Sequence, residues 1–199
     1  MPFNIEDFKA RGLAYGGARP SVFEVIIPQW PGATPEAEQQ IRFHVKASQI
    51  PPSVIGQVEI PYFGRRIKVL GDRQYANWNC TVLHDEDYSI RRAIEQWHQN
   101  MNMHIENLMN DGVTPAPNSY KRDAIVRHYS KDGHVIQTYD FKGLFPIQID
   151  AMPLDWEAID QVMMFDVEFS IDYWLPYEDA GLQENNFISE GSRTISVNP

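Results

Sequence analysis

The amino-acid sequence predicts a mainly β fold, an antiparallel β-sandwich or barrel with one flanking helix. Short segments in which apolar and polar residues alternate recur along the chain, with turn residues between them. The pair Asp132-Gly133 lies between two such segments, and Asp-Gly is a strong hairpin signal. A different stretch, after the acids at 85–87, repeats its apolar residues at i, i+4 and i+7, which is typical of an amphipathic helix.

Composition excludes several classes of function. The 199 residues include 17 Lys and Arg against 27 Asp and Glu, so the net charge is −10. Nucleic-acid binding draws on clustered basic residues, and these are scattered. A single cysteine excludes an intramolecular disulfide and a multi-cysteine zinc site. No apolar run approaches the roughly 20 residues of a membrane span, and the N-terminus lacks a signal-peptide pattern. We therefore expect a soluble, unprocessed intracellular chain without a membrane partner.

The chain divides into three predicted parts. Residues 1–19 mix glycines and charges without a sustained period, which predicts an N-terminal arm with a short helix at most over Ile5–Lys9. Residues 20–175 carry the strand signals and predict a single β domain. Residues 176–199 are polar and predict a C-terminal extension. Neither end has a regular apolar period, so we expect both to be mobile in an isolated subunit and to order against neighbours in an assembly.

The first half of the β domain is predicted as follows. Residues 20–28 form a strand, 29–39 a surface loop, and 40–46 a second strand that pairs with the first as a hairpin. Residues 53–76 alternate weakly and are broken by glycines, which suit bulges or a long excursion away from the core. Residues 77–84 form a further strand.

The second half contains the helix and the remaining strands. The helix is predicted to follow Asp85-Glu86-Asp87, whose charges suit its N-terminus, and to fade near Asn107. Residues 120–130 and 134–141 are predicted to form a hairpin, followed by an edge or bulged strand around Pro146. The last strand covers 164–174. Its apolar face is predicted to hold Phe165, Val167, Phe169, Ile171 and Tyr173, and its polar face Asp166, Glu168, Ser170 and Asp172.

Candidate chemical sites are weak. His84 and the acids at 85–87 suit a divalent cation by residue type, but a strand end followed by an acidic helix N-terminus is the favoured interpretation. Cys80 lies in the middle of a predicted strand without a sequence partner, which favours a buried small hydrophobe over a nucleophile. We predict no catalytic residue, no cofactor and no metal.

Specific strings of sequence carry a family resemblance. In chain order they are IPYFGRRIKVLGDRQYANWNCTVLHDE (60–86), YKRDAIVRHY (120–129), KGLFP (142–146), MPLDW (152–156) and FDVEFSIDYW (165–174). Together they resemble the tail tube protein of contractile-tailed bacteriophages of the T4 type, in matched order over roughly residues 20–175. The insert at 29–39 and the extension after Leu175 depart from the compact family pattern, which leaves open what these segments contact.

The resemblance implies a structural role. Hexameric rings of the β subunit would stack into an inner tube through which DNA passes without specific binding, in a virion assembled in the host cytoplasm. The implied partners are further copies of the chain, the tail sheath, the baseplate or tube initiator, and the tail terminator. The alternatives are a tube subunit of a phage-derived injection or type VI secretion-like system and, more distantly, a small cytoplasmic β-barrel enzyme or ligand carrier that uses His84 and the acids at 85–87.

Two sets of residues are candidate functional surfaces. The candidate contacts between subunits are Tyr62, Phe63, Arg65, Arg66, Asp72 and Arg73. The candidate acidic face of the lumen is Asp166, Glu168 and Asp172, because carboxylates at the wall of a conduit repel phosphates. An ordinary solvated strand face explains the same three acids, and the pattern does not decide which surface faces a lumen.

Overall fold

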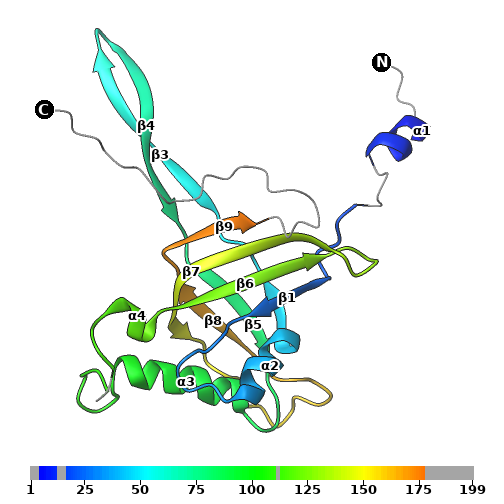
Figure 1. Cartoon of the computed structure of the whole chain (residues 1–199), viewed down its shortest axis with the longest axis vertical. Coiled ribbons are helices and arrows are strands. Elements are labelled where there is room, and N and C mark those ends of the chain that lie inside the picture. The colour runs from blue at the N-terminus through cyan, green and yellow to red at the C-terminus, as the bar shows by residue number, and fades with distance from the viewer. Residues whose placement is uncertain (1–4, 13–16, 111–112, 178–199) are drawn as a thin grey trace, which may run out of the picture.

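A computed structural model of the chain describes residues 5–12, 17–110 and 113–177 (Figure 1). The two longer helices of this part are α2 (Pro35–His44) and α3 (Ser89–Met101), and the short ones are α1 (Ile5–Asp7), the π-helix η1 (Phe8–Gly12) and α4 (Pro117–Tyr120). The nine strands of the same part are β1 (Phe23–Ile26), β2 (Val45–Ser48), β3 (Ser53–Tyr62), β4 (Arg65–Tyr75), β5 (Trp78–Leu83), β6 (Arg122–Tyr129), β7 (Val135–Ile149), β8 (Met164–Ser170) and β9 (Tyr173–Tyr177).

The main body is an antiparallel β-sandwich, as the sequence predicts. Within the described residues, seven strands follow the order β1-β6-β7-β8-β5-β2, with β9 added to β7. The long strand β7 joins the two layers, because its first part pairs with β6 and β9 and its last part with β8. The edge strands β1 and β2 do not pair with each other in this order, so the sheet is a sandwich and not a closed barrel. Of the two predicted ends, residues 1–4, 13–16 and 178–199 lie outside the described residues.

The core is built from large aromatic side chains. Trp78 of β5 is fully buried and stacks on Phe141 of β7, with ring centroids 4.6 Å apart. Helix α3 covers the core with Trp97, whose ring lies 6.4 Å from that of Phe169. The apolar face predicted for this helix is therefore confirmed. The helix ends at Met101 and not near Asn107, and Asp85 to Asp87 lie before its first turn and not in it.

The segment 35–44 corrects the prediction. It forms helix α2, where the sequence had been interpreted as a loop and the start of a strand, so a second long helix flanks the sheet. The Thr34 hydroxyl caps this helix by accepting a hydrogen bond from the backbone N–H of Ala37 (3.2 Å), and Pro35 occupies the first turn. The alternation that indicated a strand is misleading, because Ile41 is buried while Phe43 is 80% exposed.

The predicted hairpin between the strands 20–28 and 40–46 is also wrong. Strand β1 pairs with β6, while β2, which begins only at Val45, pairs with β5. Adjacent segments that both alternate often pair with each other, but here helix α2 intervenes and carries the chain to the opposite edge of the sheet.

Strands β3 and β4 form a separate two-stranded hairpin that projects from the sandwich (Figure 1). The predicted excursion from the core is thus confirmed, and so is the predicted bulge, which lies between Ile55 and Gln57. Gly71 is required at this point because a Cβ atom there would lie 2.8 Å from the backbone of Gly56.

The remaining strands follow the predicted pattern closely. Strands β6 and β7 form the hairpin expected around Asp132-Gly133, and β7 is bulged between Pro146 and Gln148. Phe165, Val167, Phe169 and Ile171 are buried as predicted. Tyr173 is not: it is 39% exposed and belongs to β9, because the chain leaves β8 after Ser170.

Gly143 allows strand β7 to cross from one layer of the sandwich to the other. Its φ is +68°, in the left-handed region, and a Cβ atom on it would lie 2.0 Å from Oδ2 of Asp172. Gly133, at φ +82°, has the same backbone requirement but open space around it. Substitutions at the two glycines therefore distinguish the effect of backbone strain, which both positions share, from the effect of a steric clash, which only Gly143 would have.

We expect Gly143→Ala to destabilise the subunit more than Gly133→Ala. Both variants bear the left-handed strain of about 1–2 kcal/mol, but only Gly143→Ala also displaces the Asp172 carboxylate from Lys121 Nζ, 2.6 Å away. The free energies of unfolding, measured by chemical denaturation, check this. Equal losses in the two variants would contradict it.

Candidate assembly surfaces

The predicted acidic face is present on β8. Asp166 and Glu168 point away from the core, on the face opposite Val167 and Phe169. Asp166 accepts a hydrogen bond from the Thr81 hydroxyl, and Glu168 accepts one of 2.7 Å from the side-chain amide of Asn77. Strand β8 lies between β7 and β5, so these two acids are in the middle of their layer.

Asp172 does not continue the acidic face along the same strand. It lies beyond the end of β8, in the turn that leads to β9, and its carboxylate forms an ion pair with Lys121 (2.6 Å). The sequence pattern places three acids on one strand face, whereas the structure brings two of them together and gives the third a basic partner.

The candidate contacts between subunits all lie on the β3–β4 hairpin. The four residues at its far end are Tyr62, Phe63, Arg65 and Arg66, while Asp72 and Arg73 lie nearer its base. Exposed apolar side chains extend along both strands of the hairpin; they are Val54, Ile55, Val58, Ile60, Ile67, Val69 and Leu70. Exposed apolar surface of this extent is typical of surfaces that pair or pack with another chain.

The turn of this hairpin is strained. Phe63 has φ +43° and Gly64 has φ +79°, so both central residues of the two-residue loop are left-handed, as a type I′ turn requires. Asparagine and glycine fit such a turn, whereas a bulky side chain costs about 1–2 kcal/mol there. Phe63 is nonetheless 91% exposed, and its ring contacts that of Tyr62 edge to face, with centroids 4.7 Å apart.

A second exposed surface, at 150–163, is missed by the sequence analysis, which uses only MPLDW (152–156) of this segment, as part of the family resemblance. Trp156 is completely exposed there, and its apolar neighbours in the segment are exposed as well; they are Leu154, Ile159 and Val162. Asp155, Glu157 and Asp160 lie between them. The signal that could have found the surface is a tryptophan flanked by acids in a segment without apolar periodicity.

The residues considered for chemistry have structural roles. Burial raises the pKa of the Cys80 thiol to about 12, which keeps it protonated. Asp87 accepts a hydrogen bond of 2.9 Å from the backbone N–H of Ser89 at the start of α3. The part of the chain that the structure describes contains no group of three or more His, Cys, Asp or Glu residues that could hold a metal ion.

A cavity of about 400 Å³ lies at the C-terminal end of α3. His98 and His104 both line it, together with Pro146 and the segment that follows the helix. Burial lowers the pKa of His98, and the carbonyl of Pro146 lies 3.1 Å from its Nε2 atom. The half-buried, hydrogen-bonded ring serves to join α3 to β7.

Comparison with known proteins decides the family. The family model for phage tail tube proteins matches residues 18–176. The chain belongs to the phage tail tube protein family. Tail tube protein gp19 of Enterobacteria phage T4 is 30% identical over 158 residues, which cover 79% of this chain and 90% of that protein. Tail tube protein gp19 of Enterobacteria phage T6 is 29% identical over the same shares.

Solved structures of contractile injection systems have a similar fold. A chain of the sheath–tube complex of PVC, an extracellular contractile injection system, aligns with a TM-score of 0.59 at 12% identity and covers 83% of this chain and 95% of its own. A chain of the tube-terminating cap of the anti-feeding prophage aligns with a TM-score of 0.56 at 13% identity, covering 81% and 91%. At these identities the likeness concerns the fold.

Among the helices of the described residues, none has the length and apolarity needed to cross a membrane.

We expect Cys80 to be unreactive in the folded tube protein. Because burial raises its pKa to about 12, the thiolate fraction is negligible at pH 7–8 and rises only as pH approaches that value. A chromogenic thiol reagent at pH 8 should react with the protein only after denaturant is added. Rapid labelling of the folded protein would contradict this placement.

Proposed function

We propose that this protein is the subunit of a tail tube in which hexameric rings stack to form the conduit for DNA ejection into the host. The observation that carries the proposal is the family match, with 30% identity to the phage T4 tail tube protein across most of both chains. The subunit acts by assembly and has no catalytic turnover, cofactor or metal.

The architecture supports assembly into rings. Within the described residues, strands β1, β2 and β9 each pair with a neighbour on one side only, and the β3–β4 hairpin extends away from the body with its apolar side chains exposed. A contact between two different surfaces of neighbouring copies closes a ring when the rotation allows it, and a second such contact stacks rings into a filament. Candidate residues for these contacts are Tyr62, Phe63, Arg65, Arg66, Asp72 and Arg73.

The further partners are a contractile sheath, a baseplate or tube initiator, and a terminator. The named complexes that share the fold support these, because they include a sheath–tube assembly and a tube-terminating cap. The virion tail is accordingly the location of the assembled protein, with assembly in the host cytoplasm. The same fold in an extracellular injection system supports a tube of such a machine as the second candidate, which differs in cargo.

Within the tube, Asp166 and Glu168 face the lumen and, with Asp172 at the margin, keep DNA from adhering. Like charge at the wall raises the energy of a nearby phosphate, and a narrow conduit with low-dielectric walls strengthens this effect. Asp172 contributes less than the other two, because Lys121 offsets its charge.

We expect the purified protein to form rings and then tubes with rising concentration. Its hairpin exposes apolar side chains in the described part of the chain, and burial of such side chains between copies is favourable. Negative-stain electron microscopy and light scattering measure the outcome, with and without a tube initiator. A protein that stays monomeric at high concentration under both conditions would refute the proposed function.

We expect the double variant Asp166→Lys, Glu168→Lys to form tubes that retain DNA at low salt. The two positions are solvent-facing, so the fold should survive. Retention should fall as salt shortens the Debye length from about 10 Å at 0.1 M to about 3 Å at 1 M. Co-sedimentation of DNA with tubes checks this, and Asp166→Asn, Glu168→Gln serves as the uncharged control. Tubes of the lysine variant that bind no DNA at either salt would place this face outside the lumen.

A further inference from the structure

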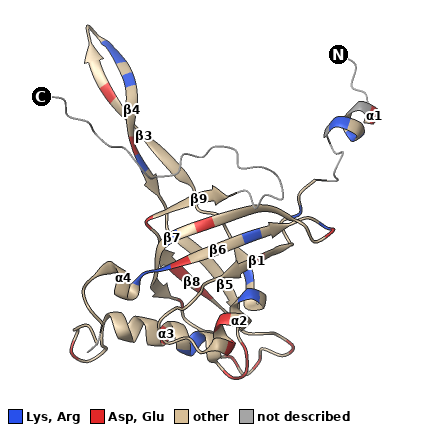
Figure 2. Ribbon diagram, viewed as in Figure 1, with Lys and Arg blue, Asp and Glu red and all other residues tan. Residues whose placement is uncertain are grey.

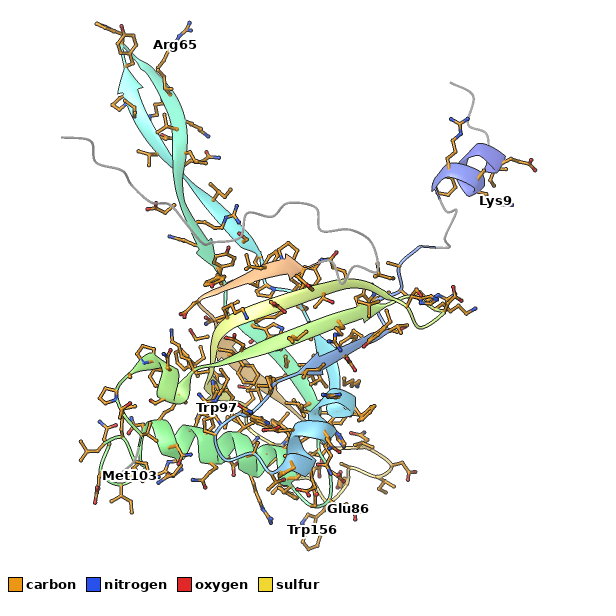
Figure 3. All side chains as sticks on the ribbon, viewed as in Figure 1. Lys9, Arg65, Glu86, Trp97, Met103 and Trp156 are labelled. Atoms are coloured by element: carbon orange, nitrogen blue, oxygen red, sulfur yellow. The ribbon has the colours of Figure 1, made fainter. Side chains whose placement is uncertain are left out.

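Two exposed apolar surfaces lie at opposite ends of the subunit. The first, which we call the hairpin tip, is residues 62–68, and the second, the acidic loop, is residues 150–163. Figure 3 shows Arg65 of the hairpin tip at one end of the long axis and Trp156 of the acidic loop at the other, near Glu86. A strand of ten residues spans roughly 30 Å, so the hairpin carries its tip well beyond the sandwich.

The hairpin tip presents an aromatic pair at the expense of local stability. Its turn places Phe63 in the left-handed region that Asn would occupy more easily, and the ring remains 91% exposed beside Tyr62. Strain of this kind persists where a side chain has a role outside the local structure. We take the exposed ring pair as a contact surface for another molecule.

The acidic loop is anchored at both ends and exposed in the middle. At its start, the backbone N–H of Asp150 donates to Asp166 O (2.9 Å), and Arg91 donates to Asp150 O (3.0 Å). At its end, the N–H of His84 donates to Met163 O (2.9 Å). Between these anchors Trp156 stands fully exposed. The hydrogen bonds at its two ends therefore hold the loop in place, while the indole ring of Trp156 is exposed to solvent.

The charges of the two surfaces are complementary. The hairpin tip carries Arg65, Arg66 and Lys68, and the acidic loop carries Asp155, Glu157 and Asp160 without a basic residue. Figure 2 shows basic positions near the far end of β4 and acidic ones in the loops at the opposite end. The ion pair of Arg66 with Glu59 (2.9 Å) is exposed, so it competes weakly with a contact between subunits.

We propose that the hairpin tip of one copy docks on the acidic loop of the next copy along the tube. In this contact Phe63 and Tyr62 pack against Trp156, and oppositely charged side chains of the two copies surround the three aromatic side chains. The proposal rests on the proposed tube function. Because the two surfaces are at opposite ends of the subunit, the contact repeats head to tail and propagates along an axis. Buried aromatic anchors supply most of the energy of such a contact, and the surrounding charges set partner and register.

The sharpest test is Phe63→Asn. This change creates the Asn-Gly pair that a type I′ turn favours, so the subunit should be at least as stable as the wild type. It also removes the exposed aromatic ring, so the critical concentration for tube growth should rise about tenfold or more. Trp156→Ala should have the same effect from the opposite end. Electron microscopy measures tubes, native mass spectrometry measures rings, and denaturation measures subunit stability.

Charge reversal tests the pairing of the two surfaces. Arg65→Glu, Arg66→Glu should block tube growth, and so should Asp155→Arg, Glu157→Arg. The chain that carries all four changes should form tubes again, because opposite charges then face each other with the signs exchanged. Lys131→Glu, in the β6–β7 turn, is the control for loss of an exposed basic residue elsewhere and should leave growth unchanged.

The outcomes separate this contact from the tube function itself. Wild-type tubes together with unaffected growth of Phe63→Asn and Trp156→Ala would overturn the contact and leave the tube function standing. Failure of the fourfold variant to recover growth would show that the two charged surfaces do not meet. Loss of rings in the hairpin variants would assign the hairpin tip to contacts within a ring. Absence of wild-type tubes would overturn the tube function and this contact with it.

Discussion

Burial of Trp78 between the two layers of the sandwich is the interaction on which the rest of the structure depends. Its ring stacks on Phe141 and lies 5.6 Å from that of Phe169, so the three side chains join β5, β7 and β8. The indole N–H donates to Ser48 Oγ (2.8 Å), which satisfies its polar atom and holds β2 at the edge of the same layer. Loss of such a ring from a core costs about 3–5 kcal/mol, a large part of the stability of a domain of this size.

The arrangement of the periphery follows from this core. Helix α3 adds Trp97, whose indole N–H donates to Tyr120 O (2.8 Å) and thereby fixes the entry to β6. Strand β7 reaches both layers because Gly143 lets the chain pass close to Asp172. The β3–β4 hairpin and the loop at 150–163 touch this core only near their bases, through Tyr75 and Met152 among the described residues, and both expose apolar side chains at the ends of the subunit (Figure 3). The subunit therefore has the surfaces of a component of an assembly.

Much of the fold could be predicted because its signals are local. The alternation of Phe165, Val167 and Phe169 reflects a strand with one buried face, and the spacing of Ile90 and Ile94 reflects a helix with one buried face. Helix α2 was missed although its start, Thr34-Pro35 followed by acids, is a helix-capping pattern. The alternation at 41–45 competed with that signal, and only packing of Ile41 against the core selects the helix.

The candidate surfaces likewise divide into features that local sequence signals indicate and features that depend on tertiary contacts. The projecting hairpin was predictable because glycine-broken strands without a core face indicate an excursion, and the candidate contacts proposed from the family resemblance lie on it. Asp172 was assigned to the acidic strand face because alternation continues through it, but its ion pair with Lys121, 51 residues away in sequence, is a tertiary contact. The exposed loop around Trp156 lacked a periodic signal altogether.

By itself, the sequence determined which segments alternate, where the main helix begins its apolar repeat, and that a chain with one cysteine has no intramolecular disulfide. These properties depend on residues within a few positions of one another. Only the tertiary structure decided that β1 pairs with β6 and β2 with β5, that Asp166 and Glu168 share a face without Asp172, and that Arg65 and Trp156 lie at opposite ends. Those outcomes depend on which distant segments bury each other's apolar faces, and local periodicity carries no information about that choice.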